Sequence, residues 1–429
     1  MPRTERHAVA FSTLGNAVAP IAALATAPVL AHALQAEGRG LVAAATAPLL
    51  LAVALGSLGL PAALNHWIAR HPGITRPAFL LSAVISAAAG AGLTVVLALL
   101  GPTLAGGHET LGRLILLAAL ALVPNLLAAL LQSVAAGHHA WRLIAIERLV
   151  TQGSRLAVIG GLALAGTLTV EFAVVAIAAS PVLGACCYLG LLRGASNQTG
   201  SSAQSAQALD ARVLVSYGGR VWFGALSGIL LSRLDQTLMV PLAGAVALGL
   251  YAVAVNIADV PLIVANAVRE VSFSDQSASN DPAALARSSR LTTAAVTLAS
   301  ISIGLAMPLA VPLLFGADFR EAVPVAAILL LGLVLGSPGS LAGVGLAAAG
   351  RPGLRSVSLA VAAVCSAVAL VLLAPVLGAL GAALATCLGN VVSAGGNLVF
   401  LRRLTGQPVS AFFGLRRSDL RAVRALLSR

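Results

Sequence analysis

The residues of this sequence that could bind or react are charged and amide side chains inside long apolar runs. Arg233 and Asp235 lie two positions apart within ILLSRLDQTLMVPLAG (229–244), and Asp259 lies in the next apolar run. A charged side chain at the centre of a membrane costs about 2.5–3.5 kcal/mol, so it normally faces the protein interior or an aqueous cavity. All three residues are therefore candidates for a binding site.

The spacing of these three residues allows two interpretations. Arg233 and Asp235 point in different directions on a helix, so they do not neutralise each other. At ~1.5 Å per residue, Arg233 and Asp259 differ in membrane depth by roughly 6 Å, which an extended arginine spans, with Asn256 nearby. One interpretation is an Arg233–Asp259 ion pair that fixes helix packing. In the other, Arg233 or Asp235 lines a cavity, where one binds phosphate or sugar and the other responds to protons.

Three further polar residues, Arg155, Asn125 and Gln132, extend this set of candidates. Arg155 lies about twelve residues inside its apolar run, whereas Arg148 is near enough to the cytoplasmic end to snorkel. Because arginine forks suit pyrophosphate oxygens, Arg155 is a candidate cavity ligand. Asn125 and Gln132 are seven positions apart and share one helix face. This polar stripe either meets sugar hydroxyls or hydrogen-bonds a neighbouring helix.

The elements that must position these residues are membrane-spanning helices. Hydrophobic residues make up 59% of the 429 residues, charged residues make up 9%, and the mean hydropathy is +0.97. A soluble domain would not expose such a surface. The apolar runs match the roughly 20 helical residues that cross a ~30 Å hydrocarbon core. The predicted spans are 9–34, 41–65, 78–101, 111–136, 143–166, 171–193, 214–242, 246–268, 291–315, 322–347, 356–376 and 379–401.

The distribution of arginine predicts the orientation of these twelve spans. All 26 basic residues are arginine, and a cytoplasmic N-terminus places twenty of them in inside segments and three in outside segments. Both termini are then cytoplasmic. The net charge of +12 follows from this topology, because no basic domain with interspersed aromatic residues lies outside the spans to bind nucleic acid. The four cysteines lie in apolar runs without metal-ligand spacing, so we expect no metal site.

The longest loop divides the spans into two groups of six. It contains SNQTGSSAQSAQ and is typical of a flexible cytoplasmic linker. The hexapeptides GLVAAA (40–45) and GLYAVA (249–254) each open the second span of a group, which indicates two homologous halves of the same orientation. The predicted parts are an N-terminal six-helix lobe (1–195), a cytoplasmic linker (196–212), a C-terminal six-helix lobe (213–402) and a basic cytoplasmic tail (403–429).

Five segments, one of which contains Arg233 and Asp235, carry a family resemblance. They are LQAEGRGLVAAA (34–45), LSRLDQTLMVPLAGAVALGLYAVAVNIADVP (231–261), LFGADFREAVPV (314–325), LAAAGRP (346–352) and LGALGAALAT (377–386). In these segments the sequence resembles the polysaccharide transport family. These proteins are the O-antigen and capsular oligosaccharide flippases of the multidrug/oligosaccharidyl-lipid/polysaccharide exporter superfamily. The resemblance covers nearly the whole chain.

The resemblance implies an all-α polytopic membrane protein with about twelve transmembrane helices. They would form two six-helix lobes around a central cationic cavity that opens to each side of the membrane in turn. The implied cargo is an undecaprenyl-pyrophosphate-linked oligosaccharide, moved from the cytoplasmic to the outer leaflet of the cell membrane. The lipid bilayer and a polysaccharide polymerase are candidate partners. No cofactor is implied, and H⁺ and Na⁺ are the candidate coupling ions.

Two other classes of protein remain as alternatives. Multidrug/cation antiporters of the same superfamily commonly carry a cation-coupling carboxylate in the first span, whereas residues 10–34 contain no acid. An integral membrane enzyme of polysaccharide assembly needs converging catalytic groups, but the acidic residues of the predicted outside segments are dispersed over several loops. We therefore expect a flippase and not an enzyme. Dye efflux coupled to Na⁺ or H⁺ would reveal the antiporter.

Overall fold

The computed structural model describes residues 3–191, 211–279, 281–416 and 419. Within these residues the chain is almost entirely helical and contains no strand, so the predicted all-α fold is confirmed. The helices are α1 (Arg3–Gly56), α2 (Leu60–Arg70), α3 (Thr75–Leu104), α4 (Glu109–Ala119), α5 (Leu122–Gly137), α6 (Trp141–Leu164), α7 (Val170–Ala185), α10 (Ala211–Ser279), α11 (Pro282–Phe315), α12 (Ala322–Ala348), α13 (Pro352–Leu377) and α14 (Ala379–Thr405). The short 3₁₀ turns are η1 (Pro72–Ile74), η2 (Cys186–Tyr188), η4 (Ala317–Phe319) and η5 (Val409–Phe412).

Nine segments of the described chain are long and apolar enough to cross a membrane. Two of them, Ile21–Gly56 and Val221–Ile263, each overlap two predicted spans, because α1 and α10 continue through an interruption. α6 corresponds to the fifth predicted span and is less apolar, since it carries four charged side chains. Each of the twelve predicted spans therefore overlaps a helix of the described chain.

The two longest helices are interrupted at equivalent positions. Gln35 in α1 has a φ angle of 57°, and Gly244 in α10 has a φ angle of 86°, so neither residue is helical. These two residues are 209 positions apart, as are Gly40 and Gly249 of the matching hexapeptides. The structural interruption thus repeats with the same offset as the internal sequence match.

Gly40 and Gly249 permit a very close approach of α1 and α10. A Cβ atom at Gly40 would lie 1.8 Å from the carbonyl oxygen of Ala245, and one at Gly249 would lie 1.9 Å from the carbonyl oxygen of Ala36. The contact is reciprocal, and no residue with a side chain fits at either position. Small residues of this kind let two helix backbones touch inside a membrane.

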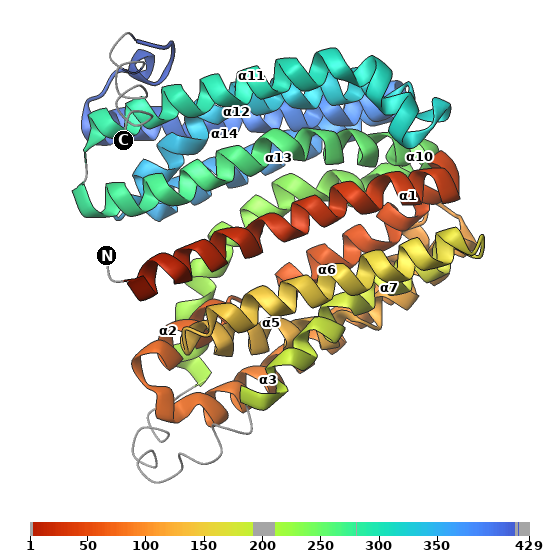
Figure 1. Cartoon of the computed structure of the whole chain (residues 1–429), viewed down its shortest axis with the longest axis horizontal. Helices are drawn as coiled ribbons and strands as arrows, with labels where there is room; N and C mark the ends of the chain where they lie inside the picture. Colours follow the sequence, from red (N-terminus) through yellow and green to blue (C-terminus); the bar gives the residue numbers. More distant parts are fainter. Residues whose placement is uncertain (1–2, 192–210, 280, 417–418, 420–429) are drawn as a thin grey trace. The chain divides into compact units, whose positions relative to one another are not determined.

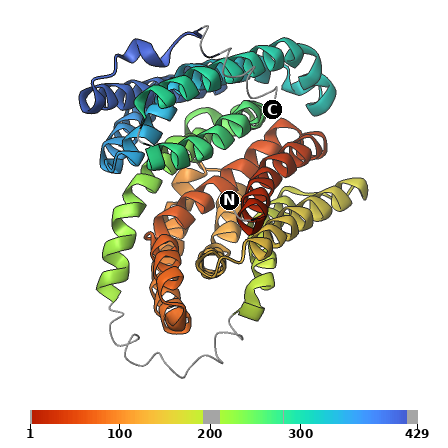
Figure 2. The ribbon, with the colours of Figure 1, turned by 60° about the vertical axis from the view of Figure 1, so that its left-hand side comes forward.

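The chain forms two compact units. The first contains Met1–Ile229 and Gln236–Gly249, and the second contains Leu230–Asp235 and Leu250–Arg429. In the first unit α6 packs against α1 and α7, while in the second α14 packs against α12 and α13. The cyan-to-blue helices of the second unit lie together in both ribbon views (Figures 1 and 2). The lobe boundaries stay predictions, and positions 196–210 of the predicted linker lie outside the described residues.

Each unit has its own apolar core. In the first unit, Leu60 and Ile68 of α2 are fully buried against Leu130 of α5 and Leu214 of α10. In the second unit, apolar side chains of α11, α12 and α14 are buried together with Phe412 of η5. The second core therefore fixes the chain that follows the last predicted span onto the helices.

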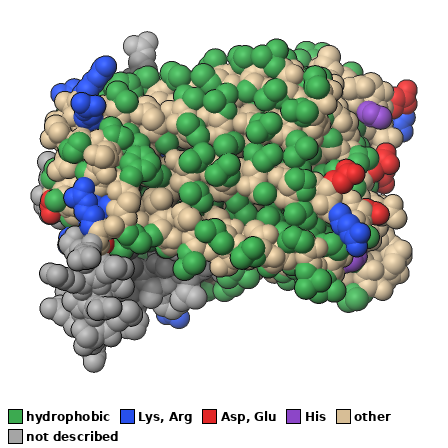
Figure 3. Space-filling model, turned by 90° about the horizontal axis from the view of Figure 1, so that it is seen from above, with side chains coloured by type: hydrophobic (Ala, Val, Ile, Leu, Met, Phe, Trp, Pro, Cys, Tyr) green, Lys and Arg blue, Asp and Glu red, His purple; other side chains and the backbone are tan. Residues whose placement is uncertain are grey.

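Large apolar side chains also cover the outer surface. On α11, Leu298, Leu305 and Leu309 are 68–79% exposed. Figure 3 shows hydrophobic side chains over the middle of one face, while charged side chains gather toward its two ends. Soluble proteins do not expose contiguous apolar surface of this kind. The chain is therefore a multi-pass membrane protein.

Candidate functional site

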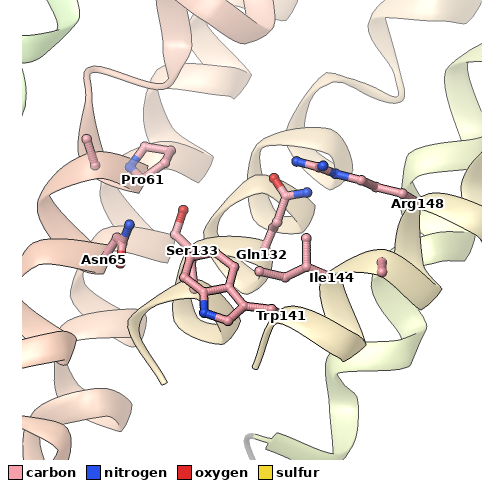
Figure 4. Close-up of a pocket in the computed structure, with 10 residues that line it drawn as sticks. Pro61, Asn65, Gln132, Ser133, Trp141, Ile144 and Arg148 are labelled. Atoms are coloured by element: carbon pink, nitrogen blue, oxygen red, sulfur yellow. The ribbon is translucent and has the colours of Figure 1, made fainter. Parts of the chain in front are cut away.

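A polar pocket of ≈ 250 Å³ opens within the first unit between α2, α5 and α6. Figure 4 shows Asn65 from α2, Gln132 and Ser133 from α5, and Trp141 and Arg148 from α6 around this pocket. Trp141 and Arg148 are seven positions apart, so α6 presents both on one face. The pocket therefore combines a guanidinium, an indole ring, two amides and a hydroxyl.

Gln132 is held in place by a buried carboxylate, that of Glu147. The Oε2 atom of Glu147 accepts hydrogen bonds from Gln132 Nε2 and from the Tyr188 hydroxyl, both at 3.2 Å. Its Oε1 atom accepts a hydrogen bond from Thr151 Oγ1 at 2.8 Å. Gly184 leaves room for this group, since a Cβ atom there would lie 1.9 Å from Thr151 Oγ1 and 3.0 Å from Glu147 Oε1. Three neutral donors thus satisfy one carboxylate, which orients Gln132 beside the pocket.

Glu147 was not among the predicted site residues, and Arg148 was expected only to reach the cytoplasm. The two residues lie near the predicted cytoplasmic end of a span, where charged side chains are usually solvated. The structure instead buries Glu147 to 7% exposure and places Arg148 at the pocket. One signal in the sequence could have found this carboxylate: Glu147 and Thr151 are four positions apart, so both lie on one face of a helix.

Arg155, a predicted cavity ligand, lies on a helix that packs against the helix of a second arginine, Arg39. α6 packs against α1, and the charge of Arg155 acts on that of Arg39. Both side chains are partly buried, and Arg39 Nε has no hydrogen-bond partner within the described residues. Two like charges close together in an apolar helical unit repel each other.

Asn125 makes contacts between helices. Its Nδ2 atom donates to the carbonyl oxygen of Ala121 at 2.7 Å and to that of Ala178 at 2.9 Å. The first bond is local, because Ala121 directly precedes α5, whereas the second bond joins α5 to α7. These bonds fit the interpretation of Asn125 as a helix-packing residue, while Gln132 lines the pocket. A role for Asn125 in binding substrate stays a prediction.

The charged residues of α10 lie together within the second unit. Asp235 is 6% exposed and accepts a hydrogen bond from the Tyr251 hydroxyl and another, at 3.3 Å, from Thr386 Oγ1 on α14. The interruption at Gly244 allows Asp235 to face a residue 16 positions further along the same helix. Arg233 is close enough to Tyr251 and Asp259 for its charge to act on both. Both interpretations of Arg233 and Asp259, as an ion pair or as cavity residues, stay open.

The candidate site contains no metal-binding cluster. Across the described ranges, no group of three or more His, Cys, Asp or Glu side chains has the geometry to hold a metal ion. The four cysteines are free thiols. What the site offers a ligand is arginine, amide, hydroxyl and aromatic groups, which suit phosphate oxygens and sugar rings.

Proteins of related sequence and structure show the family and the fold. A family model described as polysaccharide biosynthesis protein matches residues 7–273. Among solved structures, the chain is similar to the lipid II flippase MurJ in its inward closed conformation, with a TM-score of 0.70 and 12% identity over 94% of this chain and 89% of that chain. Comparison with curated proteins gives no match.

Two further structures have the same fold. An inward-facing multidrug resistance transporter of the MATE family, MOP superfamily, has a TM-score of 0.68 and 15% identity over 94% of this chain and 95% of that one. A MOP superfamily transporter from Pyrococcus furiosus has a TM-score of 0.63 and 13% identity over 94% of each chain. Because the family model covers more than half of the sequence, the chain belongs to the polysaccharide biosynthesis protein family and has the fold of MOP superfamily transporters.

Proposed function

We propose that this protein flips an undecaprenyl-pyrophosphate-linked oligosaccharide from the cytoplasmic to the outer leaflet of the cell membrane by alternating access. The observation that carries the proposal is that the charges of Arg39 and Arg155, on two helices packed together, act on each other in a polysaccharide biosynthesis protein. Placing two guanidinium groups together in a membrane protein is costly. An anionic cargo would be attracted by these two charges, whereas a cationic drug would be repelled by them.

Pyrophosphate is the anionic part of the proposed cargo. Each arginine presents a planar fork of donors that matches phosphate oxygens, and such charge-assisted hydrogen bonds are roughly twice as strong as neutral ones. The repulsion between Arg39 and Arg155 is relieved when an anion lies between or beside them. The two arginines therefore favour the loaded state of the transporter.

The pocket of Figure 4 suits the sugar part of the same cargo. Trp141 supplies an apolar ring face, and Asn65, Gln132 and Ser133 supply donors and acceptors for hydroxyl groups. Arg148 adds a cation for a phosphate or a sugar oxygen. A volume of ≈ 250 Å³ accommodates one sugar ring rather than a whole oligosaccharide. The remaining sugars of the cargo would lie outside this pocket.

Asp235 is our candidate for coupling transport to H⁺ or Na⁺. Its carboxylate is buried and receives hydrogen bonds from two hydroxyl groups, those of Tyr251 and Thr386. Hydroxyl groups can also accept, so the same partners would suit a protonated carboxyl group. In this proposal the protein transports its cargo without a chemical step, and a polysaccharide polymerase uses the cargo outside the membrane.

Replacement of the two arginines tests the proposal. We expect Arg39→Gln and Arg155→Gln each to reduce surface polysaccharide at least about tenfold, because a charge-assisted phosphate contact contributes roughly 1.5–3 kcal/mol. Membrane abundance, measured by immunoblot, should stay normal. Arg113→Gln is the matched control, since Arg113 is 84% exposed beside Glu109. This variant should transport the cargo normally. Normal surface polysaccharide in both arginine variants would contradict the proposed role.

Deletion of the gene distinguishes the flippase from the antiporter. A flippase defect should leave lipid-linked repeat units on the cytoplasmic leaflet and reduce surface polysaccharide, both of which can be measured after lipid extraction. Normal surface polysaccharide together with loss of dye efflux would instead favour a multidrug/cation antiporter. Normal transport with unpolymerised sugar would favour an enzyme of polysaccharide assembly.

A further inference from the structure

A second polar cavity, of ≈ 150 Å³, lies inside the second unit among α10, α12, α13 and α14. Leucine side chains and Ala265 form its apolar part, and none of the described residues that line it is acidic. The polar lining residues are Ser337, Ser340, Arg355, Asn390, Ser393 and Asn397. The cavity thus combines one cation with neutral hydrogen-bonding groups.

Arg355 is the charged residue of this cavity. It is partly buried near the start of α13, and it has no ion pair or hydrogen bond within the described residues. A Cβ atom at Gly343 of α12 would lie 3.3 Å from Arg355 Cδ and 2.9 Å from Asn397 Nδ2. Arg355 and Asn397 therefore share the space that Gly343 leaves open. Among the described residues, no side chain neutralises this guanidinium, so water or an anion suits it as a partner.

Two other lining residues have buried atoms without partners. Asn397 is 3% exposed, and its Nδ2 atom donates to the carbonyl oxygen of Gly339 at 3.1 Å, while its Oδ1 atom has no hydrogen-bond partner in the described chain. Ser337 is 4% exposed, and its Oγ atom likewise has no partner among the described residues. Buried polar groups without partners are costly, so both atoms point to a ligand that can hydrogen-bond them.

We propose that this cavity binds a protonated phosphate group, either of free phosphate or of a phosphomonoester lipid headgroup. A phosphate has oxygens that accept from the Arg355 fork and from Ser337 Oγ, and its remaining P–OH group donates to Asn397 Oδ1. Sulfate carries no proton at neutral pH, so it cannot satisfy Asn397 Oδ1. A phosphodiester also carries no proton at neutral pH, so it cannot donate to Asn397 Oδ1 either.

The size of the cavity agrees with this ligand. A volume of ≈ 150 Å³ equals that of about five water molecules in the liquid. A phosphate group, with one phosphorus and four oxygens, fits such a space, whereas an oligosaccharide does not. The site is independent of the proposed transport, because none of the residues assigned to the cargo lines this cavity.

Thermal unfolding of the purified full chain in a maltoside detergent tests the proposal. We expect inorganic phosphate to raise the unfolding midpoint in a saturable manner, because a ligand that binds only the folded state stabilises it. Sulfate and chloride at equal ionic strength should have no such effect. Arg355→Gln should weaken phosphate binding at least about tenfold. Arg351→Gln is the matched control, since Arg351 is exposed four positions earlier and does not line the cavity.

Two further variants keep the test decisive if Arg355→Gln fails to fold. Gly343→Ala places a methyl group between Arg355 and Asn397, and Ser337→Ala removes one predicted donor. Both should weaken the response to phosphate. Short-chain phosphatidic acid identifies the source: a shift with this phosphomonoester but not with phosphatidylglycerol supports the lipid headgroup, and a shift with phosphate alone supports the free anion. Equal shifts with sulfate, no shift with any phosphate, or unchanged binding in all three variants would overturn the proposal.

Discussion

At the scale of single residues, Glu147 has the most completely described surroundings in the first unit. Its carboxylate accepts three hydrogen bonds from Gln132, Thr151 and Tyr188, and it joins α5, α6 and η2. All three donors are neutral, so the charge of Glu147 is stabilised by hydrogen bonds rather than by an ion pair among them. This arrangement gives the pocket a fixed Gln132 amide.

We expect Glu147→Gln to destabilise the protein by about 1–3 kcal/mol, because the new NH₂ group faces a donor and leaves it without an acceptor. The thermal unfolding midpoint in detergent measures this loss. Glu109→Gln is the control, since Glu109 is 89% exposed. This variant should unfold at the same temperature as the unmodified chain. If Glu147→Gln unfolds at the same temperature as the control, the hydrogen-bond network does not stabilise the first unit.

At the scale of elements, the contact of α1 with α10 depends on two glycines. A Cβ atom at Gly40 or at Gly249 would overlap a carbonyl oxygen of the other helix. We expect Gly40→Ala and Gly249→Ala each to cost about 1–3 kcal/mol or more through forced separation of the helices. Membrane abundance and the unfolding midpoint are the measurements.

The control for the helix contact is Gly304→Ala in α11, where a Cβ atom meets nothing within 4 Å. Since alanine favours helix over glycine, this variant should be neutral or stabilising by up to about 1 kcal/mol. Equal losses in Gly40→Ala and Gly304→Ala would show that glycine itself, rather than the contact, determines stability.

A second element-scale contact fastens the chain after η5 to α11. Arg290 Nε and Nη2 each donate to a carboxylate oxygen of Asp419 at 2.7 Å, and Arg290 Nη1 donates to the carbonyl oxygen of Ala411 at 2.6 Å. The Arg290 guanidinium thereby holds the pKa of the Asp419 carboxyl below its usual value. A depressed pKa means that this contact stabilises the folded state above the unfolded-state pKa of ~3.9 and is lost as pH falls through the folded-state value.

We therefore expect trypsin to cleave slowly after Arg416 at neutral pH, and Asp419→Asn to make this cleavage fast because Arg290 loses its anionic partner. Protonation of the Asp419 carboxylate should release the same segment. Spectroscopy of the intact chain after brief exposure to pH values from 6 to about 2 can detect this release. Asp318→Asn is the control, since Asp318 is exposed. Unchanged cleavage in Asp419→Asn would show that the ion pair does not hold the segment.

At the scale of the whole molecule, the arginine distribution predicts the orientation in the membrane. We expect reporters fused after Arg212 and after Arg403 to be cytoplasmic, and a reporter after Gly244 to be external. The physical reason is the excess of arginine in the segments assigned to the inside. Alkaline phosphatase and fluorescent protein fusions give opposite signals on the two sides. An external signal at Arg212 would contradict the division into two six-helix lobes.

The sequence by itself determined the class of protein, its helices and its family. Hydropathy is a local property, so the apolar runs located the spans, and even the charged α6 was predicted as one. The repeated hexapeptides at Gly40 and Gly249 indicated two related halves, and the interruptions at Gln35 and Gly244 have the same offset. Intramembrane charge also identified Arg155, Arg233 and Asp235 as candidates, because a charge in a membrane needs a partner wherever it lies.

Only the tertiary structure decided which groups meet. The charges of Arg39 and Arg155 act on each other because α1 packs against α6, and hydropathy contains no information on which helices are neighbours. Glu147 is buried because Gly184 of α7 leaves space for it, although its place in the sequence suggested a solvated end. Arg355 was counted only as one of the arginines that set the topology, yet it lines a cavity with Asn397. In each case the partner lies on another helix, so the chemistry of the site depends on helix packing rather than on local sequence.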